Sequence, residues 1–364
     1  MNYLYIDQPQ QLSDLCSRLG RTGWIALDTE FVREKTYFPQ LCLIQVADSE
    51  EIAIIDILRL QDRSPLIALL LQPQLIKILH AAGQDMEVFF HLLDGRLPQS
   101  VVDTQLAAAA VGFGHQIGYA ALVAQLYDVQ LPKEHSRRDW RERPLPADAL
   151  TYAADDVRYL GPMYQHLQAE LEKRGRGHWL IDDYAALSNP ERYVTQPKDA
   201  WRRLGAAQRL NSRSFRVIQQ LASWRETLAQ QHNRPRQWIV RDEWLLEVAE
   251  RLPTSKQALA NIKGTSQGLL HDHADMILAV VGEARNEAAS PPPYPAPLTP
   301  EQLSQVEKLM NLAKRESLHL EVSQALLSTR KEIESLVRGE RDLPVLRSWR
   351  RDVVGEAMLS VLGE

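Results

Sequence analysis

Two acidic residues separated by a single position are the first candidates for chemistry in this sequence. Asp28 and Glu30 end the run WIALDTE at 24–30, whose short apolar character predicts a strand. Side chains two positions apart on a strand point to the same face, so the two carboxylates are neighbours. Where a strand leaves the core, neighbouring carboxylates repel each other and are partly desolvated, which is costly unless cations neutralise them. The pair therefore predicts a divalent metal site, and a solvated strand face is the alternative.

Two later segments contain further acidic candidates. Asp85 lies in HAAGQDMEV at 80–88, where an apolar strand ends and a helix is expected to begin. Stabilisation by the free amides and dipole of a helix N-terminus is the alternative role for this carboxylate. Tyr152 and Asp156 lie four residues apart in a helical segment and share one face, with an incidental exposed pair as the alternative. Three histidines are interpreted as ordinary loop or strand-end residues rather than metal ligands: His80, His115 and His135.

The elements that must position these side chains follow from the hydrophobic pattern. Five short apolar runs are expected as strands: 24–30, 41–47, 52–56, 75–79 and 101–103. Helical spacing occurs at 66–71 and 85–93, between the later strands. Three successive strands followed by strands alternating with helices predict a mixed sheet flanked by helices. From about residue 204 onward nearly everything has helical periodicity, so an α/β domain is expected to precede helical domains.

Proline-rich segments mark the expected domain boundaries. The run SPPPYPAPLTP at 290–300 lacks many amide donors and has fixed φ angles, which prevents both helix and sheet. A softer boundary lies at 188–198, where Asn-Pro and Gln-Pro pairs interrupt the helical pattern. We expect four parts in all, namely an α/β domain, a helical domain, a Pro-rich linker and a second helical domain, at 1–195, 205–288, 289–300 and 301–364.

Composition narrows the class of protein. The 364 residues include 42 Lys and Arg against 47 Asp and Glu, which gives a formal net charge of −5. This sum does not indicate a polyanion binder, but local charge rather than total charge decides such binding. Cys16 and Cys42 are too few for a disulfide framework and favour a reducing compartment. No export signal is visible and the apolar runs are too short for a membrane span, so we expect a cytoplasmic protein that does not bind membranes.

The acidic residues, taken in order, resemble a known enzyme family. An Asp-x-Glu on the first strand, an Asp after an intervening strand and a Tyr-x-x-x-Asp helix are similar to the DEDD exonucleases of the tyrosine branch. The sister branch has a histidine five residues before its last aspartate, where this sequence has Thr151. Flanking motifs extend the resemblance to the ribonuclease D family over essentially the whole chain: DTEFVR at 28–33, TYFPQL at 36–41, DTQ at 103–105 and SRRDW at 136–140. The resemblance implies a ribonuclease H-like exonuclease fold for 1–195.

The resemblance also implies a reaction and its ligands. The enzyme would be a metal-dependent 3′-to-5′ exoribonuclease that releases nucleoside 5′-monophosphates. Four carboxylates would bind two divalent cations, Mg²⁺ or Mn²⁺, which prefer such hard oxygen ligands: Asp28, Glu30, Asp85 and Asp156. In two-metal sites of this kind, one cation activates water and the other stabilises the departing 3′-oxygen.

Other residues of the family's motifs are assigned supporting roles. Tyr152 would orient the attacking water by hydrogen bonding, because an ordinary tyrosine pKa of about 10 makes it a poor base at neutral pH. Phe31 is a candidate to stack on the terminal base, with core packing as the alternative. Gln45 is a candidate to contact the ribose or the base edge. Asp139 and Trp140 are expected to border the same cleft.

The helical part of the chain contains a local excess of arginine. Nine arginines and one acidic residue, Glu226, lie between residues 200 and 241. Such an excess beside aromatic residues is what phosphate-backbone binding requires, and a solvated basic face is the alternative. The motifs Arg234-Pro235-Arg236 and Ile262-Lys263-Gly264 resemble the HRDC domain, a helical module of RecQ-type helicases and ribonuclease D. Five side chains are predicted to contact RNA: Arg213, Arg216, Arg234, Arg236 and Lys263.

The last helical segment, 301–364, resembles a second, divergent HRDC copy. It lacks counterparts of the Arg-Pro-Arg and Ile-Lys-Gly motifs, so packing against the catalytic domain is an alternative to gripping RNA. The predicted architecture is therefore an α/β ribonuclease H-like exonuclease domain followed by two all-α HRDC-like domains.

The predicted substrate is RNA with a 3′ extension, such as a tRNA precursor, acted on by a monomer. Two other functions stay open at this point: a DNA 3′-to-5′ exonuclease of the Werner or proofreading type, and a non-catalytic RNA-binding adaptor. A helicase is disfavoured because the sequence has no Gly-x-x-x-x-Gly-Lys-Ser/Thr motif for binding a nucleoside triphosphate.

Overall fold

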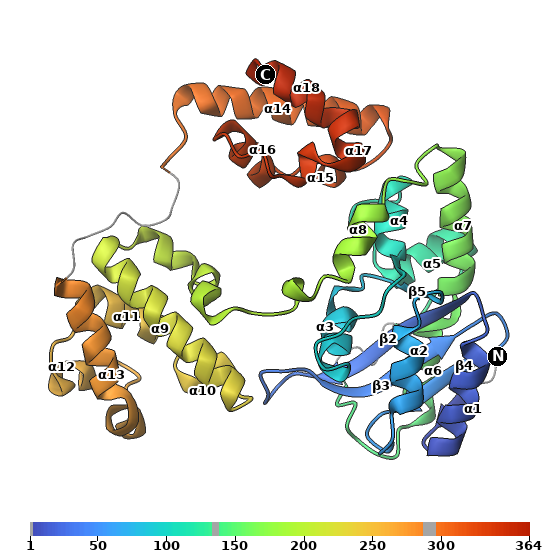
Figure 1. The fold of residues 1–364 in the computed structure, drawn as a ribbon, viewed down its shortest axis with the longest axis horizontal. Helices are drawn as coiled ribbons and strands as arrows, with labels where there is room; N and C mark the ends of the chain where they lie inside the picture. Colours follow the sequence, from blue (N-terminus) through green and yellow to red (C-terminus); the bar gives the residue numbers. More distant parts are fainter. Residues whose placement is uncertain (1–2, 133–137, 287–295) are drawn as a thin grey trace. The chain divides into compact units, whose positions relative to one another are not determined.

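The chain divides into two compact units. The computed structural model describes residues 3–132, 138–286 and 296–364 (Figure 1). The first unit comprises Met1–Val32, Leu41–Tyr193 and Pro297–Glu364, and the second comprises Arg33–Gln40 and Val194–Ala296. Each unit therefore combines segments that are far apart in the sequence.

Parts of the sequence-based interpretation fall outside the described residues. The expected Pro-rich linker at 289–300 is described only from residue 296. Five residues of the loop after Pro132 are not described, among them His135, Ser136 and Arg137. The expected domain limits at 195, 205, 288 and 301 stay predictions.

A six-stranded mixed sheet organises the first unit. The strand order is β1-β4-β3-β2-β5-β6, with parallel pairing of β1 to β4, β2 to β5 and β5 to β6 and antiparallel pairing of β3 to β4. The strands are β1 (Leu4–Ile6), β2 (Trp24–Val32), β3 (Gln40–Ala47), β4 (Ile52–Asp56), β5 (Ile76–Leu79) and β6 (Val101–Asp103). The predicted mixed sheet flanked by helices is confirmed. The short strand β1 was not predicted.

Eight helices of the same unit cover the sheet (Figure 1). They are α1 (Pro9–Leu19), α2 (Ser64–Leu71), α3 (Gly83–Leu92), α4 (Thr104–Ala110), α5 (Tyr119–Tyr127), α6 (Ala147–Arg158), α7 (Leu160–Lys173) and α8 (Ile181–Leu187). Alternate residues of β2 point to opposite faces of the sheet. Ile25 and Leu27 accordingly pack with α1, α2 and α3, whereas Ala26 packs with α4 to α7. The sheet therefore separates two apolar cores.

Helix α6 lies close to the sheet because its buried face is made of small residues. Ala149, Ala153, Ala154 and Val157 recur at helical spacing and are at most 1% exposed. Small side chains allow a helix to approach a strand closely, and α6 packs against both β2 and β4. This approach carries the neighbouring polar residues of α6 toward β2.

The C-terminal helices share the core of α4 to α7. They are α14 (Pro300–His319), α15 (Gln324–Leu327), α16 (Arg330–Val337), α17 (Ser348–Arg350) and α18 (Glu356–Leu362). Trp349 stacks on Trp179 with ring centroids 3.9 Å apart, and Arg350 forms an ion pair with Asp183 at 3.0 Å. Arg176 donates to the carbonyl of Ala110 at 2.7 Å and to that of Leu320 at 2.8 Å. These contacts fasten the C-terminal helices to the α/β part of the unit.

The second unit is helical. Its elements are the 3₁₀ helices η2 (Pro197–Arg203) and η3 (Gly205–Arg209), followed by α9 (Ser212–Gln231), α10 (Arg236–Ile239), α11 (Asp242–Arg251), α12 (Lys256–Ala260) and α13 (Gln267–Asn286). The Asn211 side chain accepts hydrogen bonds from the backbone amides of Arg213 and Ser214, which fixes the start of α9. Val217 and Leu221 then lie in the centre of the core, fully buried.

The loop between β2 and β3 belongs to this second unit. The Asn233 side-chain oxygen accepts hydrogen bonds from the backbone amides of Tyr37 and Phe38, both at 3.0 Å. The Tyr37 hydroxyl donates to the buried Glu226 carboxylate, and the Arg236 guanidinium lies 4.6 Å from the centre of the Tyr37 ring. The helical unit therefore holds a segment that follows β2 directly. Among the described residues, no helix is long and apolar enough to cross a membrane.

Candidate active site

The acidic residues converge at β2. Asp28 and Glu30 project from the same face of β2, and Asp156 reaches them from α6. One carboxylate oxygen from each of these three residues lies within 4.8 Å of the other two. Asp85, in the first turn of α3, is buried beside them and accepts a hydrogen bond from the Thr29 hydroxyl at 2.6 Å. Four carboxylates that are up to 128 positions apart in the sequence therefore meet at one place.

The electrostatics of this cluster favour protons or cations. Burial, together with the charges of Asp156 and Asp85, raises the pKa of Glu30 from 4.5 to about 9. Burial, with the charges of Asp155 and Asp85, raises the pKa of Asp156 to about 8. The pKa of Asp28 is likewise raised well above its ordinary value, first by burial. Burial also raises the pKa of Asp85 to about 6, against the opposing effect of the Thr29 hydrogen bond. Positive charge at this place would therefore be strongly stabilised.

The donor set fits hard divalent cations. All four groups supply carboxylate oxygens, the ligands that Mg²⁺ and Mn²⁺ prefer over imidazole or thiolate. Burial and mutual repulsion disfavour the ionised forms of these carboxylates, and a bound cation would offset both effects. The cluster is thus suited to divalent metal ions.

Tyr152 lies one helical turn before Asp156, as its spacing predicts. Its hydroxyl makes a hydrogen bond with the Asp156 carboxyl. Burial raises the pKa of Tyr152, and the charges of Asp156, Glu30 and Asp28 raise it further, so the phenol stays protonated at neutral pH. Trp140, which is 1% exposed, stacks on the Tyr152 ring with centroids 6.2 Å apart. The tyrosine is therefore a fixed hydrogen-bonding group and not a base.

A pocket of about 420 Å³ opens over the carboxylates. Its wall includes Phe31 and Tyr152 in addition to three of the carboxylates, Asp28, Glu30 and Asp156. The wall also includes residues that were not predicted to belong to the site, among them His80, Gln84 and Tyr119. The Tyr119 hydroxyl donates to the carbonyl of Asp155 at 2.7 Å and accepts from the amide of Tyr159 at 3.1 Å, so it braces the end of α6. No local motif marks this residue in the sequence.

His80 directly follows the last residue of β5 and also faces the pocket. The ring lines the pocket, but its Nδ1 lies 2.9 Å from the Thr104 hydroxyl and its Nε2 lies 2.9 Å from the carbonyl of Ile117. Both ring nitrogens are thus engaged in hydrogen bonds that hold neighbouring segments together. His115 is described as well, and it does not belong to the carboxylate group.

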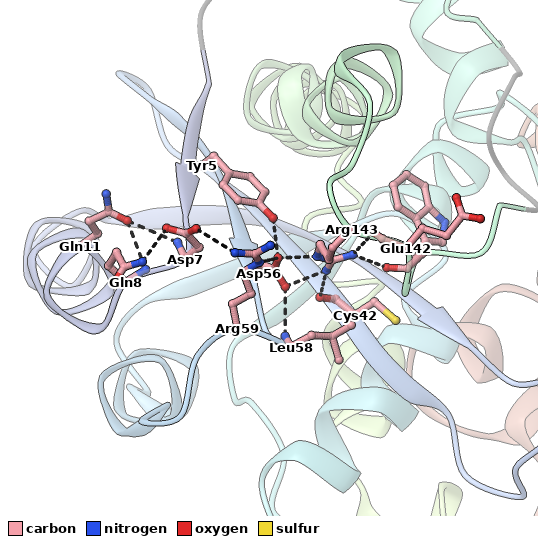
Figure 2. Close-up of polar contacts among 11 residues, drawn as sticks. Tyr5, Asp7, Gln8, Gln11, Cys42, Asp56, Leu58, Arg59, Glu142 and Arg143 are labelled. Atoms are coloured by element: carbon pink, nitrogen blue, oxygen red, sulfur yellow. Dashed lines mark hydrogen bonds and ion pairs between the residues drawn. The ribbon is translucent and has the colours of Figure 1, made fainter.

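A buried ion pair anchors the loop that carries Trp140 (Figure 2). Asp56, at the end of β4, is 0% exposed and accepts hydrogen bonds from Arg143, including one from Nη2 at 2.7 Å. The Tyr5 hydroxyl also donates to Asp56. Burial opposes ionisation of Asp56, but the bonds from Arg143 and Tyr5 lower its pKa below the ordinary value. Arg143 in turn donates to the carbonyl of Trp140 at 2.7 Å, which fixes the loop beside Tyr152.

The predicted substrate contacts have different surroundings. Gln45 is fully buried on β3, and neither its amide nitrogen nor its amide oxygen has a hydrogen-bond partner in the described part of the chain. A contact with a ribose or base edge would require this side chain to become accessible.

In the second unit, Arg213, Arg234 and Lys263 are exposed and Arg216 is half-buried. Arg236 is engaged with Glu226. Their RNA contacts stay predictions.

A mixed sheet with helices on both faces, with two carboxylates on β2 and two more reaching them from α3 and α6, defines a 3′–5′ exonuclease domain. A family model described as 3′-5′ exonuclease matches residues 3–172, and the HRDC domain model matches residues 214–281. The ribonuclease D of Gluconacetobacter diazotrophicus is 38% identical, over 98% of this chain and 92% of that protein. The ribonuclease D of Escherichia coli is 36% identical, over 100% and 99% of the two chains.

A solved structure is similar to this one over the whole chain. The crystal structure of Escherichia coli RNase D, described as an exoribonuclease involved in structured RNA processing, superposes with a TM-score of 0.89 at 35% identity, covering 100% of this chain and 99% of that one. This chain belongs to the ribonuclease D family. It is an exoribonuclease, a hydrolase of phosphodiester bonds in RNA, and the non-catalytic adaptor alternative is wrong.

Proposed function

We propose that the enzyme hydrolyses the 3′-terminal phosphodiester bond of RNA by a two-metal-ion mechanism and releases nucleoside 5′-monophosphates. Two Mg²⁺ or Mn²⁺ ions would be held by Asp28, Glu30, Asp85 and Asp156. The observation that carries this proposal is the approach of three of these carboxylates to within 4.8 Å of one another, with Asp85 buried beside them. When bound, the cations supply charge stabilisation at the scissile phosphate.

The remaining groups of the site position the reactants. Tyr152 keeps its proton, so it can hold the attacking water by a hydrogen bond while its own hydroxyl contacts Asp156. The Trp140 ring restricts the motion of the Tyr152 ring by stacking on it. Phe31, which follows Glu30 and lines the pocket, would stack on the terminal base.

The proposed substrates are structured RNAs with 3′ extensions, such as tRNA precursors. This choice is supported by the 35% identical Escherichia coli exoribonuclease, which is described as acting in structured RNA processing. The same relatives favour RNA over the DNA alternative. We also propose that the enzyme works as a cytoplasmic monomer, with its two cysteines free and buried and with the exonuclease and HRDC-like domains at the limits predicted above.

The test is digestion of a 3′-extended tRNA precursor that is labelled at its 5′ end or at its 3′ end. With Mg²⁺ or Mn²⁺, the 3′ label should appear as mononucleotides while the 5′-labelled product shortens stepwise. Asp28→Ala and Asp156→Ala should reduce the rate at least about 10³-fold, because each removes a ligand from the site. Glu50→Ala, at an exposed position between β3 and β4, is the matched control and should keep full activity.

Other products would contradict the proposal. Internal fragments, or mononucleotides released from the 5′ end, are incompatible with 3′-to-5′ exonuclease action. A DNA strand of the same sequence, mixed with the RNA in equal amounts, should be digested more slowly, and preferential loss of the DNA would reverse the choice of substrate.

A further inference from the structure

A second pocket lies within the helical unit. It has a volume of about 470 Å³, within the range of small-ligand sites. Its walls come from three segments of that unit: the loop at Arg33–Gln40, the end of η2, and the stretch from α9 to the start of α11. None of the residues assigned to the carboxylate site contributes to its walls.

Arginines are the most numerous charged residues of this pocket. Four arginines line it: Arg33, Arg203, Arg225 and Arg236. Glu34 and Asp242 also line it, and Glu226 forms an ion pair with Arg236. Four arginines therefore face three carboxylates. An excess of guanidinium groups around one concave surface favours a phosphate, which accepts their paired N–H donors.

Two of these arginines are held in place by the protein. Arg225 is 4% exposed and donates to the carbonyl of Val240 at 3.0 Å and to Asp242 at 2.6 Å. Its Nε has no hydrogen-bond partner in the described part of the chain. Arg236 donates two hydrogen bonds to the Glu226 carboxylate and lies over the Tyr37 ring. Guanidinium groups fixed in this way lose little conformational freedom when an anion binds.

The other cationic groups lie at more accessible positions. Arg203 is exposed and donates to the Thr195 hydroxyl at 3.3 Å, and Arg33 directly follows β2 and donates to the carbonyl of Tyr37 at 2.9 Å. Trp238, which also lines the pocket, is 59% exposed, a large value for an indole. An exposed indole beside fixed cations is the combination that binds a base by stacking and its phosphate by charge.

We propose that this pocket is a subsite for one nucleotide of the RNA strand, with its phosphate bound by Arg33 and Arg203 and its base stacked on Trp238. The inference rests on the proposed function, because an RNA-degrading enzyme meets a phosphate and a base in every nucleotide of its substrate. Arg225 and Arg236, each already paired with a carboxylate, form the fixed wall behind these two arginines. The subsite recognises the chemistry of a nucleotide and not its sequence, because every base has a face for stacking.

The test measures RNA binding without hydrolysis. A fluorescent single-stranded RNA is titrated with the full-length protein in EDTA, and the dissociation constant is read from fluorescence anisotropy at several salt concentrations. Arg203→Ala and Trp238→Ala should each raise the dissociation constant about tenfold. Arg203→Ala should also reduce the salt dependence by about one phosphate contact, whereas Trp238→Ala should leave it unchanged. Trp238→Phe keeps an aromatic ring and should restore most of the affinity.

The matched control is Arg251→Ala. Arg251 is an arginine of the same unit with its side chain 60% exposed, paired with Glu247 and absent from the pocket walls, so this variant should bind RNA like the unaltered protein. An abasic ribose-phosphate strand should bind Trp238→Ala and the unaltered protein equally, because neither complex contains a stacked base.

Three results would overturn the subsite. In the first, Arg203→Ala and Trp238→Ala bind RNA as tightly as the unaltered protein. In the second, adenosine 5′-monophosphate competes with RNA at equal concentration, which would make the pocket a free-nucleotide site. In the third, the variants lose binding of poly-glutamate but not of RNA, which would indicate that the ligand of the pocket is an acidic peptide. If the unaltered protein with Mg²⁺ releases no mononucleotides, the proposed function fails, and that outcome is separate from these three.

Discussion

Metal binding at the carboxylate site should release protons. Glu30 and Asp156 have pKa values of about 9 and about 8, so both carboxyls are protonated at pH 7 in the absence of metal. Cations bind the ionised forms, so loading the carboxylate site at pH 7 should release about two protons from these two groups. Since both groups lose their protons as the pH rises, the apparent affinity should increase with pH. The expected increase is at most about 100-fold between pH 6.5 and pH 7.5, about tenfold for each proton.

Isothermal titration calorimetry measures this release directly. MnCl₂ is titrated into the protein at pH 7 in two buffers of different ionisation enthalpy, and the difference between the observed heats gives the number of protons taken up by the buffer. Glu30→Gln removes the group with the higher pKa of the two and should release about one proton fewer. Glu50→Gln should behave like the unaltered protein. Equal heats in both buffers, together with an affinity that does not change between pH 6.5 and pH 7.5, would refute the reasoning.

Three further substitutions test a hydroxyl of the site and two contacts that stabilise the fold. Tyr152→Phe should lower the rate constant of single-turnover digestion about 10- to 100-fold, because it removes a positioning hydroxyl and no metal ligand; an unchanged rate constant would contradict that role. Asp56→Ala leaves the Arg143 guanidinium buried without its carboxylate, so urea denaturation should show a loss of about 3–5 kcal/mol in the free energy of unfolding. Trp349→Ala removes the stacked partner of Trp179 and should cost about 3–5 kcal/mol in the same measurement. A loss below about 1 kcal/mol in either case would show that the contact is dispensable.

The parts of the fold that depend on local periodicity could be predicted from the sequence. Strand alternation placed Asp28 and Glu30 on one face, and helical spacing placed Tyr152 and Asp156 together. Their meeting at one place does not follow from spacing, and it was expected only from the resemblance to a family whose motifs occur in the same order.

Contacts between distant segments could not be predicted in this way. Arg143 reaches Asp56 across 87 positions, and no local pattern specifies that pairing. Gln45 was predicted to contact the ribose or the base edge, but whether other elements cover it depends on tertiary packing, and its side chain is fully buried. Tyr119 was missed for the same reason. Its hydroxyl bonds to the backbone carbonyl of Asp155 and to the backbone amide of Tyr159, and both residues are more than 30 positions away in the sequence.

The split of each compact unit between distant parts of the chain limits how the enzyme can be dissected. A gene fragment encoding only 1–195 would lack the C-terminal helices that cover Trp179 and pair with Asp183, and would expose apolar surface to water. It would also keep Tyr37 while discarding Glu226 and Asn233, the residues that hold that loop. Truncation would therefore disturb the fold as well as remove an activity. Substitutions in the full-length protein are the better way to assign activities to parts of this enzyme.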